Sequence, residues 1–223
     1  MCTVVCRWAP PEPVQILAVR DELVSRDFDP PDEWWPAQPG VVGGRDQQAG
    51  GSWCVSDVAS GVTALVLNRV ERRTGTPSRG VLPLAAVSAG QSWPQRVAHR
   101  DMAAFNLVLA DPAGLTVWTW DAETLTKAEL APGVHMITSS GVDTDDAKTT
   151  AFAPRFTSEA WIDVITSCEP VDDPRALVVR HPIDEDVYAT VLAQLITAEP
   201  GALQISYSRT PWVAASWTAD VWP

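Results

Sequence analysis

The sequence predicts an α+β fold in which two antiparallel sheets are covered by helices. Most of the 223 residues follow the alternating apolar and polar pattern of β-strands, helical periodicity is confined to the middle of the chain, and strand patterns return near its C-terminal end. Strands before and after a group of helices are typical of antiparallel sheets with helices on their faces. With 46% hydrophobic and 20% charged residues, we expect one domain over residues 1–223.

Strands are expected first along the chain. Their predicted ranges are 3–8, 15–19, 51–55, 63–68, 105–110, 115–120 and 134–138. The turn Asp111-Pro112-Ala113-Gly114 separates two of these ranges, so 105–110 and 115–120 are expected to form a hairpin.

Helices are expected at 82–89, 95–104 and 158–166. The last of these has Trp161, Val164 and Ile165 at helical spacing after a Thr157 or Ser158 cap. Strands are expected again at 188–196 and 203–208. From about residue 210 the chain is rich in Trp and Pro, and we expect this tail to wrap the surface or cover a sheet edge.

Cys2 is the first candidate for chemistry. If Met1 is removed, residue 2 carries both a thiol and a free α-amine, and an amine with a pKa of about 8 can withdraw the thiol proton. Nucleophile and base would then belong to one residue. The alternative, that Cys2 is an inert packing residue, stays open on this observation alone.

Arg20 and Asp21 are the expected partners of Cys2. They follow the apolar run 14–19, so a strand, a short turn and a second strand would bring them back beside Cys2. A guanidinium near a thiol favours the thiolate, and a carboxylate can orient an ammonium group. An ordinary solvated turn at Arg20 and Asp21 is the alternative.

Several short motifs occur in one order along the chain. They are Met1-Cys2, Arg20-Asp21-Glu22 with Ser25-Arg26, Gly50-Gly51-Ser52-Trp53, the run 64–69 containing Asn68, Ser78-Arg79-Gly80, the run 105–111, Pro132-Gly133-Val134-His135 and Tyr188-Ala189-Thr190. In this order they resemble the NRDE family, also called transport and Golgi organisation 2 homologues. The resemblance covers nearly the whole chain, although each motif alone is weak.

The resemblance implies a fold and a chemistry. The family is similar to the N-terminal-nucleophile hydrolases, which have a four-layer αββα sandwich of two antiparallel sheets. Choloylglycine and penicillin V hydrolases of that superfamily also begin with Met-Cys. Carried over, Cys2 would be the nucleophile of a C–N amide hydrolase, Arg20 and Asp21 would support it, and Asn68 would be an oxyanion donor. An ordinary turn at the end of a strand is the alternative for Asn68.

Three positions depart from the family pattern. Val19 stands where the NRDE motif has asparagine, Val191 follows Tyr188-Ala189-Thr190 where the family usually has arginine, and no Ser-Asn pair follows His135. A complete hydrolase site therefore cannot be written from the sequence.

Composition excludes some functions. The formal net charge of -12 disfavours a nucleic-acid partner, and the scattered cysteines give no zinc pattern, so we expect no metal. No apolar run approaches the roughly 20 residues that span a bilayer, and no signal peptide is evident, which predicts a cytoplasmic protein. The oligomeric state stays open.

Aromatic residues suggest where a ligand would bind. Trp34, Trp35 and Trp53 are candidate contacts for a small-molecule amide or a haem-like ligand, although Trp34 and Trp35 could equally attach their loop to the core. Because the family has been connected with haem handling, the competing prediction is a non-catalytic protein that binds haem or another apolar ligand, with His135 among its contacts. The hydrolase requires no cofactor.

Overall fold

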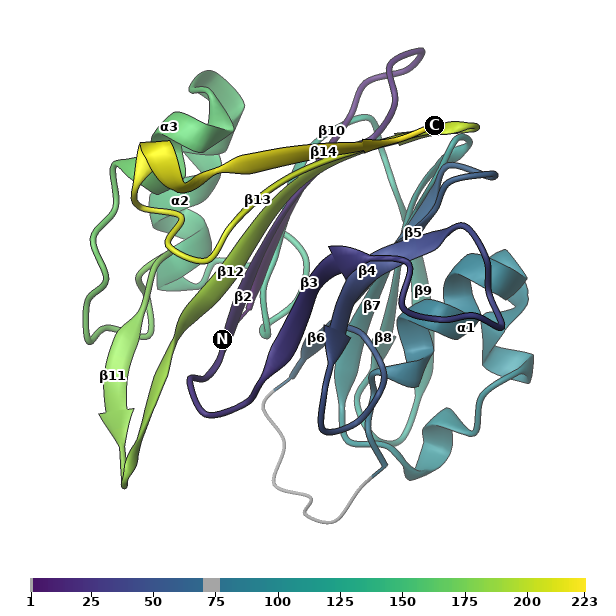
Figure 1. Cartoon of the computed structure of the whole chain (residues 1–223), viewed down its shortest axis with the longest axis horizontal. Coiled ribbons are helices and arrows are strands. Elements are labelled where there is room, and N and C mark those ends of the chain that lie inside the picture. The colour runs from purple at the N-terminus through teal and green to yellow at the C-terminus, as the bar shows by residue number, and fades with distance from the viewer. Residues whose placement is uncertain (1, 70–76) are drawn as a thin grey trace.

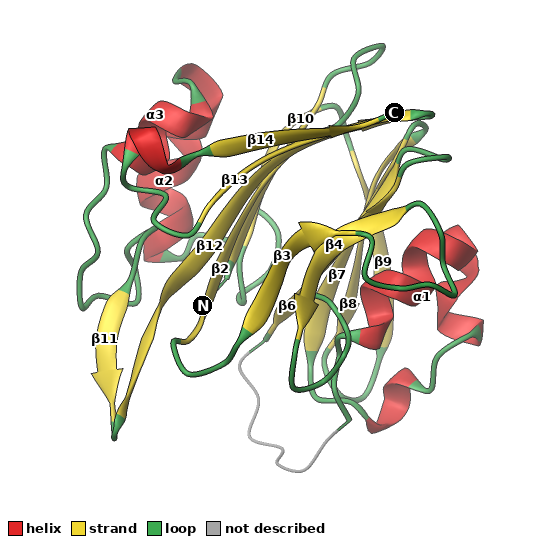
Figure 2. Ribbon diagram, in the orientation of Figure 1, coloured by secondary structure: helices red, strands yellow, loops and turns green. Residues whose placement is uncertain are grey.

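The protein consists of two seven-stranded antiparallel sheets stacked face to face, with helices outside each sheet (Figures 1 and 2). This description comes from a computed structural model and covers residues 2–69 and 77–223. The expectation about Met1 and its removal lies outside the described residues.

The first sheet contains the two ends of the described chain. Its strand order is β10-β1-β2-β12-β13-β14, and β11 pairs separately with β12. The strands are β1 (Thr3–Trp8), β2 (Gln15–Leu23), β10 (Gly133–Ile137), β11 (Arg180–Ile183), β12 (Asp186–Glu199), β13 (Ala202–Ser208) and β14 (Thr218–Trp222).

The second sheet runs in simple chain order from β3 to β9, so each strand pairs with its sequence neighbour. Its strands are β3 (Phe28–Asp32), β4 (Val41–Asp46), β5 (Cys54–Asp57), β6 (Val62–Asn68), β7 (Phe105–Asp111), β8 (Gly114–Trp120) and β9 (Leu125–Leu130). The predicted hairpin is confirmed as β7 and β8.

Three apolar clusters hold four layers together. The central cluster joins the facing sides of the two sheets and includes Cys6, Ile16, Leu65 and Val108. A second cluster packs α1 (Val81–Ala89) on the outer face of the second sheet. The third packs α2 (Ala147–Ser158) and α3 (Trp161–Thr166) on the outer face of the first sheet. The αββα arrangement and the α+β class are therefore confirmed (Figure 1).

Part of the helix prediction was wrong. Residues 95–104 do not form an α-helix, because Met102, Ala103 and Ala104 are buried in extended chain that leads into β7, and Trp120 Nε1 donates to the Met102 carbonyl at 3.1 Å. Short 3₁₀ turns occupy Gly90–Gln95 and His99–Asp101 instead, and a third lies at Ala214–Ser216. The predicted helix at 158–166 begins only at Trp161, after the separate helix α2.

The C-terminal tail supplies the edge strand β14, which pairs with β13 from Tyr207↔Thr218 to Leu203↔Trp222. This confirms that the tail covers a sheet edge. Within the described residues, no helix combines the length and the apolar character needed to cross a membrane.

Candidate active site

A cleft of about 390 Å³ opens where the ends of both sheets meet. The first sheet contributes residues at the start of β1, the end of β2 and the start of β12, and the second sheet contributes residues at the ends of β4 and β6. The residues that line it are Cys2, Arg20, Asp21, Glu22, Arg26, Asp46, Ser52, Trp53, Val66, Asn68, Pro77, Ser78, Arg79, Gly80 and Tyr188. Four residues expected in the site, Cys2, Arg20, Asp21 and Asn68, are thus brought together.

Strand pairing places Cys2 beside Arg20 and Asp21. Thr3 pairs with Val19 in the antiparallel β1–β2 ladder, so the preceding residue, Cys2, lies next to the end of β2. The Cys2 thiol lies 3.6 Å from the Asp21 carbonyl oxygen, which also accepts a hydrogen bond from the Tyr188 hydroxyl at 3.2 Å. The expected strand–turn–strand arrangement is confirmed.

Successive residues of β2 point to opposite faces of the first sheet. Arg20 points toward the second sheet, where its guanidinium carbon lies 4.1 Å from the centre of the Trp53 ring. Asp21 points toward the helices, where its Oδ2 lies 3.9 Å from Lys148 Nζ on α2. The thiol is therefore approached by a cation within the cleft and by a carboxylate from behind the sheet.

The surroundings of the Cys2 thiol favour its protonated form. Burial raises the pKa of Cys2, the Asp21 carboxylate raises it further, and Arg20 acts in the opposite direction. A thiol in this state needs a base before it can act as a nucleophile.

Arg20 is buried, with 5% of its surface exposed, and is only partly neutralised. Its Nη2 lies 3.6 Å from Glu22 Oε2 and 3.8 Å from Asp46 Oδ2. Burial lowers the pKa of Arg20, and these carboxylates oppose that effect. Nη1 has no hydrogen-bond partner among the described residues. Because an unsatisfied buried donor is costly, Nη1 is the group in the cleft best suited to meet an oxygen atom of a ligand.

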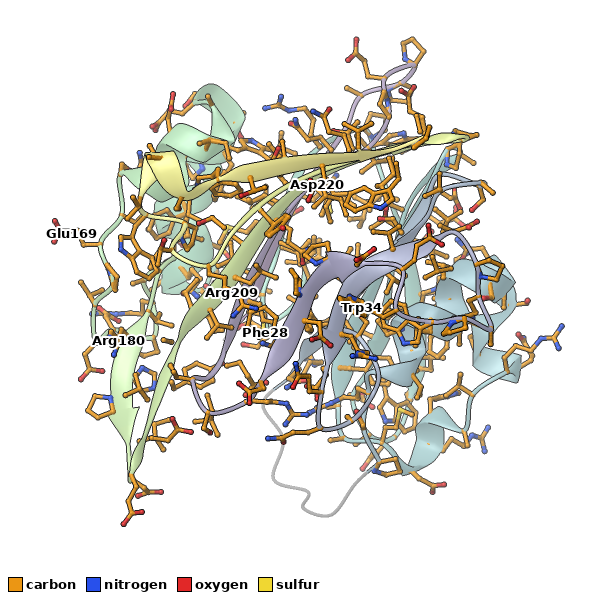
Figure 3. The ribbon with its side chains drawn as sticks, viewed as in Figure 1. Phe28, Trp34, Glu169, Arg180, Arg209 and Asp220 are labelled. Atoms are coloured by element: carbon orange, nitrogen blue, oxygen red, sulfur yellow. The ribbon has the colours of Figure 1, made fainter. Side chains whose placement is uncertain are left out.

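Aromatic rings hold the Arg20 side chain in place. The Phe28 and Trp53 rings meet edge to face with their centres 5.5 Å apart, and Arg20 lies 5.0 Å from the Phe28 ring centre. The guanidinium carbon of Arg209 lies 4.4 Å from the centre of the same ring, and its Nη2 donates to the Phe28 carbonyl oxygen at 3.2 Å. Figure 3 shows Arg209 and Phe28 next to each other. Phe28 is therefore held by Arg20 of β2 and by Arg209, which directly follows β13.

Asp21 has both carboxylate oxygens engaged. Thr190 Oγ1 donates to Oδ1 at 2.7 Å, and Lys148 Nζ lies near Oδ2. Asp21 is 3% exposed, so these contacts replace water around a buried charge.

Two glycine-containing motifs meet to form one wall of the cleft. The Ser52 backbone N–H donates to the Gly80 carbonyl oxygen at 2.9 Å. A Cβ atom on Gly51 would lie 2.6 Å from the carbonyl group of Gly80, so only glycine fits there. The motifs Gly51-Ser52-Trp53 and Ser78-Arg79-Gly80 are far apart in sequence, and this close approach packs them against each other in one wall of the cleft.

Several cleft residues were not predicted as site residues. Among them are these six: Glu22, Arg26, Asp46, Ser78, Arg79 and Tyr188. Arg26 Nε donates to Asp46 Oδ2 at 2.6 Å; burial would raise the pKa of Asp46, but this hydrogen bond and that from the Ala49 N–H lower it overall. All except Asp46 belong to the family motifs quoted above, so the order of motifs was the signal that could have found them.

Trp34 and Trp35, two of the expected ligand contacts, lie outside the cleft. Trp34 donates to the Pro30 carbonyl oxygen and stacks against Arg45, while Trp35 donates to the Gly50 carbonyl oxygen and packs on the outer cluster with α1. These tryptophans attach their loop to the core, so the expectation that they wall the site is not met. Of the predicted tryptophans, Trp53 alone lines the cleft.

His135 is also away from the cleft. It lies on β10 opposite Cys6, with Nδ1 2.7 Å from Asp143 Oδ2 and Nε2 2.8 Å from the Ala131 carbonyl oxygen. Both ring nitrogens are engaged by protein oxygens, so the histidine fixes a turn.

The fold and the cleft define a class of protein, a four-layer αββα sandwich that presents a cysteine at residue 2 between its two sheets. Residues 1–167 match the family described as Transport and Golgi organisation 2, and the chain belongs to this family. No curated protein matches the sequence. Among solved structures, the chain is similar to the Caenorhabditis elegans N-acylethanolamine-hydrolyzing acid amidase ortholog, with 8% identity, a TM-score of 0.48, and coverage of 90% of this chain and 93% of that chain.

Proposed function

We propose that this protein is a cysteine hydrolase of the N-terminal-nucleophile type that acts on a C–N amide bond of a small molecule. The observation that carries the proposal is the position of the Cys2 thiol in a cleft beside a buried carboxylate and a buried arginine, whose Nη1 has no hydrogen-bond partner in the described part of the chain. A cleft of about 390 Å³ has the size of a small-molecule site.

The proposed reaction begins after Met1 is removed. The α-amine of residue 2 takes the thiol proton, and the sulfur attacks the acyl carbon to form a tetrahedral intermediate. The ammonium then returns the proton to the leaving nitrogen, the C–N bond breaks, and a thioester remains. Water attacks the thioester with the amine again as base, which releases a carboxylic acid and restores the thiol.

Three other residues have proposed roles. Asp21 accepts a hydrogen bond from the α-ammonium group of residue 2 and keeps that group oriented. Arg20 Nη1 donates to the oxyanion, because it is a buried guanidinium nitrogen that has no hydrogen-bond partner among the described residues. Asn68, which is exposed at the cleft rim, supplies a second donor.

The alternative of haem binding has less support. Met136 is 1% exposed inside the cluster behind the first sheet, and among the described cleft residues no histidine occurs. His135 has both ring nitrogens engaged, and His99 packs edge to face against Trp93 and Trp120. The nitrogen and thioether ligands that haem iron takes in proteins therefore do not fit this cleft.

A labelling experiment tests the hydrolase proposal. Protein whose Met1 has been removed is treated with a brief pulse of iodoacetamide and analysed by intact mass and peptide mapping. We expect Cys2 to be alkylated at least tenfold faster than Cys168, a half-buried cysteine outside the cleft that serves as the internal control.

An amide-substrate screen completes the test. We expect Cys2→Ala to lose turnover and to keep its cooperative unfolding transition. If Cys2→Ala hydrolyses the same amides at the wild-type rate, the proposed role of Cys2 is refuted.

A further inference from the structure

A buried lysine lies behind the nucleophile. Lys148, in the first turn of α2, is 5% exposed, and its Nζ donates to Thr3 Oγ1 at 3.3 Å and lies 3.9 Å from Asp21 Oδ2. Lysine is almost never this deeply buried unless it is paired, because desolvating an ammonium group is costly. Lys148 therefore contacts Thr3, the residue after Cys2, and Asp21, the proposed partner of the Cys2 α-amine.

We propose that Lys148 is a positioning residue for the nucleophile, which fixes the Asp21 carboxylate in the orientation that residue 2 requires. This inference rests on the proposed function, since it assigns Asp21 as the partner of the α-amine. Lys148 lies on the helix side of the sheet and does not line the cleft, so it acts through Asp21.

The geometry holds Asp21 from two elements at once. Thr190 of β12 engages Oδ1, and Lys148 of α2 faces Oδ2, so the carboxylate cannot rotate without losing a contact. Among the described residues, the ionisable groups near Asp21 include Cys2 before β1, Arg20 and Glu22 on β2, and Tyr188 on β12. Lys148 also ties the carboxylate to β1 through Thr3, the residue that follows Cys2.

The start of α2 is itself fixed, which gives Lys148 a defined position. Asp146 caps the helix by accepting from the Thr149 backbone N–H at 2.9 Å, and the Thr138 hydroxyl donates to the same carboxylate at 2.9 Å. A cavity of about 160 Å³, lined in part by Lys148, Ser139 and Arg175, lies beside this turn. It offers a small amine a route to the position of the lysine side chain.

The test measures the rate of Cys2 alkylation by iodoacetamide between pH 5 and pH 9, in protein whose Met1 has been removed. Lys148→Ala is expected to lower the rate about tenfold at pH 7, because Asp21 then loses the contact that holds Oδ2 and no longer orients residue 2. Lys148→Arg should recover the wild-type profile to within about threefold, and added ethylammonium should raise the rate of Lys148→Ala. Lys127→Ala, at the chain's other lysine on the exposed strand β9, is the matched control and should match wild type.

The outcomes separate the two proposals. If wild-type Cys2 reacts rapidly and Lys148→Ala has the wild-type profile, the inference is overturned while the proposed function stands. If wild-type Cys2 reacts no faster than Cys168, the proposed function and the inference both fall. If Lys148→Ala does not fold, Thr3→Val replaces it in the test. This substitution removes the hydroxyl that accepts from Lys148 and keeps the Lys148 and Asp21 side chains, so it should lower the alkylation rate about threefold. An unchanged profile of Thr3→Val would overturn the inference.

Discussion

Replacing Thr190 with valine tests the buried network behind the cleft. The Thr190 hydroxyl donates to Asp21 Oδ1 at 2.7 Å and accepts from the Val179 backbone N–H at 3.0 Å, and the residue is 2% exposed. Valine has a similar shape but neither donates nor accepts. The substitution therefore separates the two hydrogen bonds from side-chain packing.

The expected magnitude follows from these two bonds. A hydrogen bond to a charged group contributes about 1.5–3 kcal/mol, and a buried N–H left without a partner costs about 1–3 kcal/mol. The methyl group that valine adds returns about 1 kcal/mol of apolar burial. We expect Thr190→Val to lower the free energy of unfolding by about 2–4 kcal/mol, because the terms are not fully additive.

Urea unfolding at pH 7 measures the effect against two control variants. Thr190→Ser keeps the hydroxyl and should lose only about 1 kcal/mol for the missing methyl group. Thr197→Val changes a half-buried threonine of the same strand that makes no side-chain hydrogen bond to the described residues, and it should stay within about 0.5 kcal/mol of wild type. Equal stability of Thr190→Val and Thr190→Ser would refute the reasoning.

Three other substitutions have defined outcomes. Gly51→Ala should cost about 1–3 kcal/mol in urea unfolding and slow Cys2 alkylation, because its Cβ would meet the Gly80 carbonyl group at 2.6 Å; wild-type stability would show that this wall tolerates a methyl group. Burial would raise the pKa of Asp146, but hydrogen bonds from the Thr149 N–H, Thr144 and Thr138 lower it from 3.8 to about 2, so its stabilisation is present above about pH 4 and lost as the pH falls through 2. Asp146→Asn should therefore cost about 1–2 kcal/mol at pH 7, and in an acid titration of urea unfolding the difference from wild type should shrink below pH 4 and vanish below pH 2. His135→Gln should lower thermal stability and leave Cys2 alkylation unchanged, whereas slower alkylation would connect this turn to the cleft.

Local patterns predicted the centre of both sheets. The pair β1 and β2 was predictable because two apolar runs, 4–6 and 16–19, are joined by a short turn, and their pairing brings Cys2 to Arg20. The hairpin β7–β8 was predictable because the turn sequence Asp111-Pro112-Ala113-Gly114 separates two apolar runs.

The strands β3, β4, β9, β11 and β14 were not predicted. Two of them, β3 and β4, lack a continuous apolar run for specific reasons. In β3, Pro30 and Pro31 lie at an edge where β3 and β4 pair irregularly, so no ladder hydrogen bond from them is required. In β4, Gly44 has no side chain because a Cβ there would lie 2.4 Å from the Trp53 ring. Both strands are defined by tertiary packing, which a window of sequence does not contain.

The cleft was predictable only in part, because its residues come from strands and loops that meet through the fold. Cys2, Arg20 and Asp21 share one ladder, and the sequence places them together. Asp46 and Tyr188 reach the cleft from β4 and β12, and no spacing along the chain relates them. Trp34 and Trp35 misled because composition cannot tell a tryptophan that lines a cleft from one that attaches a loop to the core.

The first departure from the family pattern leaves the cleft intact. Val19 is 2% exposed and packs with Val5, Leu17 and Phe156 in the cluster beneath α2 and α3. Since Arg20 points into the cleft, residue 19 must point to the helices. Valine in place of asparagine therefore changes packing behind the sheet and removes no polar group from the cleft.

The departure at Val191 falls on a backbone feature that the site needs. In a regular strand Thr190 and Leu192 would point to the same face, but the register of β12 shifts between them, so Thr190 pairs with Asp21 and Leu192 with Arg20. Because Asp21 and Arg20 point to opposite faces, this bulge is what turns the Thr190 hydroxyl toward the Asp21 carboxylate. Residue 191 is the extra backbone residue of this bulge, and valine can take that backbone position as well as arginine can.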